Sequence, residues 1–316
     1  MFRGTEGMLA GNPDIDRVLT ISPQPGVAEF ATLAGKLWRQ YDIAISTQAG
    51  DRPTVLAGIA GRFRVGLVDK TGVFWKRLLL NRAVAADAGV HRVIELARLA
   101  SALGIDDRPD IVVPRQIPPM APRPAPYAVL HANPMYRIRR WTDEGWRALA
   151  EALAQRGLAV VATGGPAAEE RDYLDRLWDP VRPRVERADG RLSWGELAQL
   201  LSGAAVFVGP DTSMTHLAAG SGCPTVAIYG PASPHGMGPW PVGGLREGWA
   251  RAGTIQNRGN VWVVQNPLPC MPCDLLGCER HLESYSRCLD ELPVGRVLEA
   301  VDLAMGRVAM TAQTGT

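Results

Sequence analysis

The sequence predicts an α/β protein with parallel, doubly wound sheets, divided into two domains. Short β-branched segments alternate with amphipathic segments along most of the chain, and parallel strands require helical crossovers of this kind. The proline-rich segment 113–126 interrupts the alternation. The chain also has 316 residues, which exceeds the ordinary size of one hydrophobic core.

The first part of the chain contains three predicted strands, each followed by a predicted helix. The strands are short β-branched runs at Arg17–Ile21, Asp42–Ser46 and Arg64–Val68. The helices are Val27–Arg39, Thr54–Ala60 and His91–Leu103, and Gly104 is the expected stop of the last one.

The domain boundary is predicted at segment 113–126, which contains six prolines and cannot be a central strand or a helix interior. We therefore assign residues 1–118 to the first domain and residues 119–292 to the second. Residues 293–316 form a closing element and tail, in which Val294–Met305 has the apolar spacing of an amphipathic helix.

The second domain shows a regular alternation of strands and helices. Its predicted strands are Tyr127–His131, Leu158–Ala162, Ala205–Val208 and Thr225–Tyr229. Thr142 is placed to cap the helix between the first two strands, and Gly157 is placed to end it. A βαβαβ series of this kind is typical of a parallel sheet covered on both faces.

Three further helix starts are predicted in this domain. Pro166 is expected just inside the first of them, where the following Glu169 and Glu170 suit the positive helix N-terminus. Ser193 and Glu196 form a capping box for the helix that runs through Leu201. The third helix is Thr212–Ala219.

The composition excludes some classes of function. Lys and Arg total 34 and Asp and Glu total 32, and this balance argues against a nucleic-acid-binding protein. No apolar run reaches the roughly 18 residues of a membrane span, and the first residues lack the apolar core of a signal peptide. We therefore expect a cytoplasmic protein with at most peripheral contact at the inner face of the membrane.

The loops that follow the predicted strands contain the candidate ligand-binding residues. In open parallel sheets, ligands bind beyond the carboxyl ends of the strands. These ends are His131–Pro134, Thr163–Gly165, Gly209–Ser213 and Gly230–Pro231. Turn formation alone explains Gly and Pro in any one loop, but all four loops fall on the same predicted edge.

The segment Gly209–Gly222 (GPDTSMTHLAAGSG) is the strongest candidate for a phosphate site. A buried strand leads through a turn into a helix, and the free N–H groups and dipole of that helix start favour an anion. The hydroxyls of Thr212 and Ser213 add donors, although helix capping also explains them. His216 lies one turn further on the same face as Thr212, as either a structural residue or a ligand contact.

A basic loop, Tyr136–Trp141 (YRIRRW), follows the first strand of the second domain. Its arginines include Arg139 and Arg140. They are either solvated side chains or cations that face a diphosphate, for which the planar guanidinium is well suited.

These motifs together resemble one protein family. The run HxxP…RRW, a strand that ends in TGGP, and LSWGELAQLLSGAAVFVGPDTSMTHLAAGSGCPTVAIYGPASP are similar to the ADP-heptose:lipopolysaccharide heptosyltransferases of glycosyltransferase family 9. The resemblance is strong from Tyr127 onward and weak before it. It implies a GT-B fold, in which two Rossmann-like domains bind the sugar donor (C-terminal domain) and the acceptor (N-terminal domain).

The resemblance also implies a reaction and its partners. The expected reaction transfers a heptose or related sugar from a nucleoside-diphosphate sugar, such as ADP-heptose, to a hydroxyl of a lipopolysaccharide-type or other glycan acceptor, with no catalytic metal. Arg139 matches the family's basic position, and Glu196 matches an acidic position near the nucleoside. The residues expected to bind the donor are Asn133, Arg139, Arg140, Thr163, Gly164, Gly165, Glu196, Asp211, Thr212, Ser213 and His216.

The start of the chain departs from the family pattern. Family members begin with a strand and a loop whose Asp is the expected general base, and here no Asp matches that motif, Asp14, Asp16 and Asp51 included. We therefore expect the natural protein to begin about 40 residues upstream, and this 316-residue form to bind donor but transfer sugar poorly. The alternative is a non-catalytic nucleotide-sugar-binding protein. A sugar-nucleotide epimerase is less consistent, because no convincing set of acid/base residues is present.

Four cysteines gather near the end of the chain, at Cys270, Cys273, Cys278 and Cys288. Their spacing allows a structural zinc site, although zinc motifs more often use two close pairs. Reduced thiols are the main alternative, and a disulfide is the least expected in a cytosolic protein.

Overall fold

The computed structural model describes residues 1–69, 74–106 and 109–306. The chain divides into two compact units. Unit 1 contains Met1–Glu6 and Asp14–Asp110, and unit 2 contains Gly7–Pro13 and Ile111–Thr316. The proline-rich segment 113–126 thus belongs to unit 2. None of the helices in the described ranges is long and apolar enough to cross a membrane.

Unit 1 is built on a parallel sheet of three strands in the order β1-β2-β3 within the described residues. The strands are β1 (Tyr41–Ser46), β2 (Gly61–Val68) and β3 (Arg82–Ala85). The helices are α1 (Val27–Leu37), α2 (Asp51–Ala60), α3 (Phe74–Leu79) and α4 (Arg92–Ser101). A 3-10 turn, η1 (Glu6–Leu9), lies where the chain first passes from unit 1 into unit 2. Val65 and Leu67 of β2 pack with Leu99 of α4 in the core.

The predicted strand Arg17–Ile21 is wrong. This segment forms an isolated parallel bridge between Ile21 and Phe2, through hydrogen bonds from Ile21 N to Met1 O (2.9 Å) and from Arg3 N to Ile21 O (3.0 Å). These two bonds do not extend into a ladder, so no strand forms. Strand β1 is at the edge of the described sheet, and Ile43 on it is 49% exposed.

Unit 2 has a seven-stranded sheet in the order β6-β5-β4-β7-β8-β10-β9 within the described residues. Its strands are β4 (Tyr127–His131), β5 (Ala159–Thr163), β6 (Val185–Arg187), β7 (Val206–Pro210), β8 (Thr225–Ile228), β9 (Ile255–Arg258) and β10 (Val261–Val264). All neighbours pair in parallel except β9 and β10. The expected doubly wound parallel sheet is therefore confirmed.

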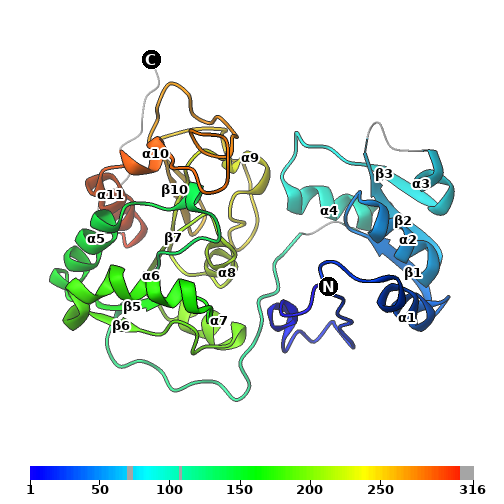
Figure 1. Ribbon diagram of the computed structural model, residues 1–316, viewed down its shortest axis with the longest axis horizontal. Coiled ribbons are helices and arrows are strands. Elements are labelled where there is room, and N and C mark those ends of the chain that lie inside the picture. Colours follow the sequence, from blue (N-terminus) through cyan, green and yellow to red (C-terminus); the bar gives the residue numbers. More distant parts are fainter. Residues whose placement is uncertain (70–73, 107–108, 307–316) are drawn as a thin grey trace. The chain divides into compact units, whose positions relative to one another are not determined.

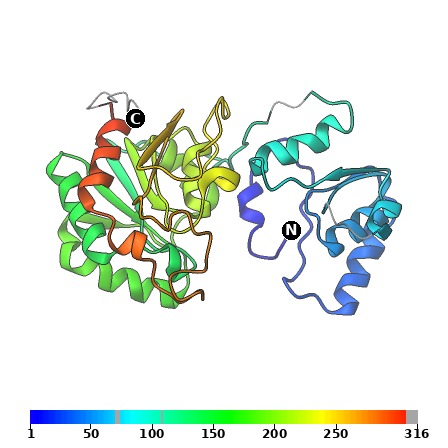
Figure 2. The same cartoon turned by 90° about the horizontal axis from the view of Figure 1, so that it is seen from above.

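Helices cover both faces of this sheet (Figure 1). The helices are α5 (Asp143–Gln155), α6 (Ala168–Trp178), α7 (Trp194–Ser202), α8 (Ser213–Gly220), α9 (Pro234–Met237), α10 (Arg287–Asp290) and α11 (Val294–Ala304), with 3-10 turns η2 (Arg137–Arg139) and η3 (Asp179–Arg184). Helices α5, α6 and α11 pack on one face through residues such as Trp146, Leu177 and Val301. Helices α7 and α8 pack on the other through Leu201 and Leu217. Figure 2 shows the closing helix α11 in red beside this sheet.

Most of the helix caps and helix starts predicted in unit 2 are confirmed. The Thr142 hydroxyl accepts from Gly145 N, and Ser193 and Glu196 form the complete capping box. Pro166 is an exception, because α6 begins at Ala168 with Ala167 as its N-cap, so the proline precedes the helix. The hairpin of β9 and β10 was not predicted; its sequence signal is the turn at Gly259–Asn260 between two β-forming runs.

Candidate functional site

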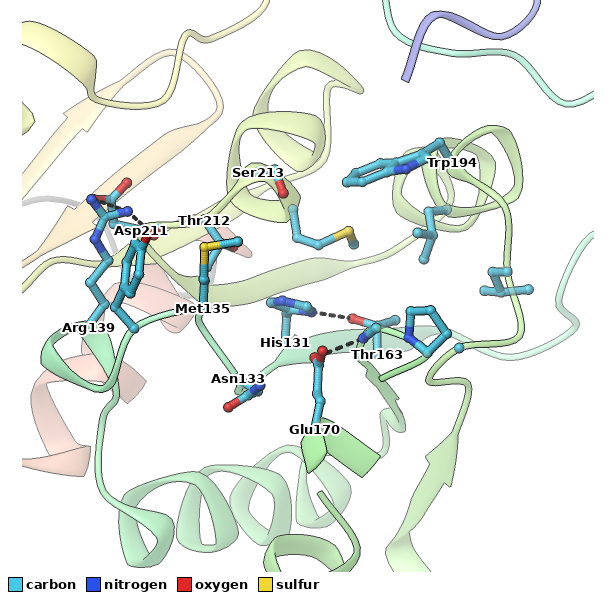
Figure 3. A pocket seen from close by; sticks show the side chains of 18 residues that line it. His131, Asn133, Met135, Arg139, Thr163, Glu170, Trp194, Asp211, Thr212 and Ser213 are labelled. Carbon is cyan, nitrogen blue, oxygen red and sulfur yellow. Dashed lines mark hydrogen bonds and ion pairs between the residues drawn. The ribbon is translucent and has the colours of Figure 1, made fainter. Parts of the chain in front are cut away.

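A cavity of about 540 Å³ lies in unit 2, where β4, β5 and β7 end (Figure 3). Parallel strands end at the same edge, so the loops that follow them converge there. The lining residues are His131, Asn133, Met135, Tyr136, Arg139, Thr163, Gly164, Gly165, Pro166, Glu170, Gly190, Leu192, Trp194, Leu197, Asp211, Thr212, Ser213 and Met214. Eight of the eleven predicted donor-binding residues are in this set.

The start of α8 forms one wall of the cavity. Thr212 is the N-cap residue, and its carbonyl accepts from Thr215 N (3.1 Å) and His216 N (3.3 Å). Its side chain makes no capping bond, and its buried Oγ1 has no hydrogen-bond partner among the described residues. Because the first N–H groups of a helix also lack intrahelical acceptors, the wall presents several donors. This hydroxyl therefore does not cap the helix, although Thr212 lines the cavity.

Arg139 lies in η2, next to Asp211. Its Nη1 is 3.2 Å from Asp211 Oδ2 and donates to the Asp211 carbonyl at 3.0 Å. The side chain of Arg139 is 38% exposed, so it can also reach a ligand. The Tyr229 hydroxyl donates to Asp211 Oδ1 at 3.2 Å. Asp211 thus holds Arg139 beside the start of α8.

His131 ends β4 and faces Thr163 at the end of β5. Its Nδ1 lies 3.2 Å from Thr163 Oγ1, and the hydroxyl donates in turn to the Leu130 carbonyl (3.2 Å). Burial lowers the pKa of His131 from 6.5 to about 4. The imidazole is therefore neutral near pH 7.

Two glycines after β5 allow the chain to pass close to other groups. A Cβ on Gly164 would lie 2.3 Å from Leu174 Cδ1, and one on Gly165 would lie 2.5 Å from Glu170 Oε2. Glu170 accepts a hydrogen bond from Gly165 N at 2.8 Å through Oε1. Close packing against Leu174 and Glu170 thus explains the two glycines of the TGGP run.

The opposite end of the cavity is apolar. Leu192, Trp194, Leu197 and Met214 line it, mostly from α7 and the loop before it. Figure 3 shows the Trp194 indole at the far side of the cavity from Arg139 and Asp211. Sequence reasoning treated the LSWGEL run as a helix start and missed this role. The signal that could have found it is a large aromatic residue at the first position of a helix, where burial inside the core is not expected.

Three predicted donor-binding residues do not line the cavity. Arg140 stacks 4.0 Å from the Tyr173 ring and donates to Asn133 Oδ1 at 2.9 Å, so it supports a lining residue. The Glu196 carboxylate accepts from Ser193 N at 2.7 Å in the capping box. His216 Nε2 lies 4.0 Å from Asp211 Oδ1, and the residue is not part of the lining. Direct contact of these three with a donor stays a prediction.

The cysteines are all free thiols, and Cys288 is buried while Cys270 and Cys278 are exposed. Among the described residues, no group of three or more His, Cys, Asp or Glu side chains is arranged to hold a metal ion. Structural zinc at this cluster stays a prediction.

The arrangement of the cavity suits an elongated ligand with an anionic part and a flat apolar part. Arg139, the Thr212 hydroxyl and the helix start would bind the anion, with charge-assisted hydrogen bonds from the guanidinium. Trp194 and its apolar neighbours would pack against a planar ring. A nucleoside diphosphate has both parts.

Comparisons with known proteins agree with this description. The family model described as glycosyltransferase family 9 (heptosyltransferase) matches residues 31–243. Lipopolysaccharide heptosyltransferase 1 of Pseudomonas aeruginosa is 36% identical over 110 residues, which are 35% of this chain and 30% of that protein. The lipopolysaccharide core heptosyltransferase OpsX of Haemophilus influenzae is 19% identical over 210 residues, or 64% and 60% of the two chains.

Solved structures show the same fold over most of the chain. A family 9 glycosyl transferase from Veillonella parvula has a TM-score of 0.73 at 15% identity, covering 96% of this chain and 86% of the other. The E. coli heptosyltransferase WaaC with ADP has a TM-score of 0.66 at 21% identity, covering 92% and 84%. These likenesses identify the fold as the GT-B type, with two Rossmann-like units in one chain. The chain spans less than a third of the length of the Pseudomonas relative that it matches in sequence.

Proposed function

Because the chain belongs to glycosyltransferase family 9, we propose that it transfers a heptose or a related sugar from a nucleoside-diphosphate sugar to a hydroxyl group of a lipopolysaccharide-type glycan. The observation that carries this proposal is the unit 2 cavity, with Arg139 and an unpartnered Thr212 hydroxyl at one end and Trp194 at the other. ADP-heptose is the proposed donor, because the E. coli heptosyltransferase WaaC has been solved both with ADP and with ADP-2-deoxy-2-fluoro heptose.

The donor diphosphate is placed at the start of α8. The free N–H groups there and the hydroxyls of Thr212 and Ser213 donate to its oxygens, and the Arg139 guanidinium neutralises charge. When the bond between the sugar and the diphosphate breaks, negative charge grows on the leaving ADP. Donors already in place for that charge stabilise the transition state more than the ground state.

The nucleoside is placed at the apolar end. The adenine ring packs against Trp194, with Leu192 and Met214 beside it. This orientation directs the sugar toward the Arg139 and Asp211 side of the cavity. The acceptor glycan or glycolipid is assigned to unit 1, as the family resemblance implies.

Titration calorimetry with ADP tests the donor site. Arg139→Ala is expected to weaken ADP binding about tenfold to a hundredfold, because a charge-assisted contact contributes roughly 1.5–3 kcal/mol. Thr212→Val removes the free hydroxyl but keeps the shape, and it should weaken binding by a smaller factor. Arg182→Ala is the matched control, because this arginine of unit 2 is exposed and outside the cavity lining.

Unchanged ADP affinity in both Arg139→Ala and Thr212→Val would refute the donor site. A separate assay, release of ADP from ADP-heptose when a glycan acceptor is added, distinguishes transfer from mere binding. Tight ADP binding without acceptor-dependent release would favour a nucleotide-sugar-binding protein.

A further inference from the structure

The segment that contains the four clustered cysteines, residues 270–288, packs in unit 2 beside the turn that carries Arg139. Two of its serines are fully or almost fully buried: Ser284 has no exposed surface and Ser286 is 2% exposed. The segment also contacts the loop after β8, since Asp274 N donates to the Pro231 carbonyl at 2.9 Å. It is thus an integrated part of the unit, with no role in the donor contacts described above.

Ser286 connects this segment to the Arg139 turn. Its Oγ donates to the carbonyl of Ile138 at 2.7 Å, across 148 residues of sequence, and the bond is buried. Ile138 immediately precedes Arg139 and is itself buried. Gly277 of the same segment packs against this residue, where a Cβ would lie 2.9 Å from Ile138 Cγ2.

A second hydrogen bond holds the other end of the turn. Trp141 Nε1 donates to the carbonyl of Leu292 at 3.0 Å, just after α10, and both residues are buried. Arg139 therefore lies between two points, Ile138 and Trp141, that are both attached to the C-terminal part of the chain. Without such attachments, a three-residue 3-10 turn has few internal hydrogen bonds to fix its geometry.

We propose that Ser286 is a positioning residue for Arg139, and that the cysteine-bearing segment 270–288 acts as the support that holds this arginine against the donor diphosphate. The inference rests on the proposed function, because it requires Arg139 to contact phosphate. It also gives a role in the donor site to the cysteine motif, whose residues do not line the cavity.

The test compares ADP with adenosine, which lacks the diphosphate. Ser286→Ala removes the bond to the Ile138 carbonyl and should weaken ADP binding about threefold to tenfold. Adenosine affinity, followed by ligand-observed NMR, should stay unchanged, because Arg139 does not contact the nucleoside. In an Arg139→Ala background, Ser286→Ala should cause no further loss of ADP affinity, since the two residues act through one contact.

Thr225→Val is the matched control. Thr225 is also fully buried and its hydroxyl donates to a backbone carbonyl at 2.8 Å, but it lies at the opposite end of β8 from the cavity. This variant should leave ADP affinity unchanged. Ser286→Cys keeps nearly the same volume but has a weaker hydrogen-bond donor. It serves as the second variant if Ser286→Ala does not fold. We expect it to lose ADP affinity selectively, by a smaller factor than Ser286→Ala.

Equal losses for ADP and adenosine, or an additive loss in the Arg139→Ala background, would overturn the positioning role. So would unchanged ADP affinity in Ser286→Ala while Arg139→Ala alone weakens binding. If instead Arg139→Ala itself leaves ADP affinity unchanged, the proposed donor site fails and the inference fails with it. The two kinds of failure are therefore separate results.

Discussion

Asp211 is the residue on which the polar end of the cavity depends. Its two carboxylate oxygens have different partners, the Tyr229 hydroxyl at Oδ1 and the Arg139 guanidinium at Oδ2. Tyr229 is almost fully buried, so its hydroxyl gives Asp211 a fixed orientation. An arginine held by a fixed carboxylate loses less side-chain freedom when it binds a ligand, which favours tight contact with a diphosphate.

The buried His131 predicts a pH dependence of stability. Its pKa falls from 6.5 to about 4 on folding because burial disfavours the charged ring. Between these values the unfolded state binds more protons, so stability is full above pH 6.5 and falls as the pH drops toward 4. The loss between pH 7.5 and 4.5 should be about 2–3 kcal/mol in the free energy of unfolding.

Urea denaturation of the natural protein and of His131→Gln at both pH values measures this loss. Other titrating groups contribute equally to the two proteins, so the difference between their pH dependences isolates His131. Parallel pH dependences in the two proteins would contradict the prediction.

At the scale of elements, two substitutions at the start of α7 distinguish a structural role of Glu196 from a role in binding the donor. Ser193→Ala removes the N-cap and should destabilise the protein by about 1 kcal/mol. Glu196→Ala removes the other half of the capping box and should also lower stability. If Glu196 acts only in the capping box, neither change weakens ADP binding more than about twofold. A tenfold loss of ADP affinity in Glu196→Ala, with Ser193→Ala unaffected, would instead indicate contact with the nucleoside.

The cysteine-bearing segment allows a direct test for metal. We expect reduced thiols, because zinc motifs more often use two close cysteine pairs than the spacing found here. Elemental analysis of gently purified protein should find no stoichiometric zinc, and all five cysteines should react with a thiol reagent in denaturant. About one equivalent of zinc, with a melting temperature lowered by a chelator, would show the structural zinc site instead.

At the scale of the whole molecule, the cavity belongs entirely to unit 2. Every lining residue falls between 131 and 214, and the hydrophobic clusters on both faces of the seven-stranded sheet lie in the same unit. Residues 111–316 expressed alone should therefore fold and bind ADP within about threefold of the full chain. A small loss is expected because the fragment lacks Gly7, a unit 2 residue that packs against Trp194.

Calorimetry on both proteins, with a melting curve as the control for folding, measures this difference. A folded 111–316 fragment that does not bind ADP would show that residues before 111 contribute to the donor site.

The sequence by itself determined the parts of this protein that depend on local signals. Strands β4, β5, β7 and β8, the Thr142 and Ser193 caps and the helix start at Thr212 follow from residue spacing and capping chemistry, which act within a few residues. The same local rules failed at Arg17–Ile21, where the residues favour a strand but the described chain provides no ladder for it. A strand requires a partner, and its own sequence does not supply one.

Tertiary structure decided which of these residues come together. The contact between Arg139 and Asp211 joins residues 72 apart, and the bond between Ser286 and Ile138 joins residues 148 apart. The position of Trp194 in the cavity likewise depends on how α7 packs on the sheet. Such contacts depend on the packing of whole elements, because no local propensity specifies a partner at that separation. Local chemistry therefore predicted a phosphate site at the start of α8, and only the folded chain showed which residues hold Arg139 beside it.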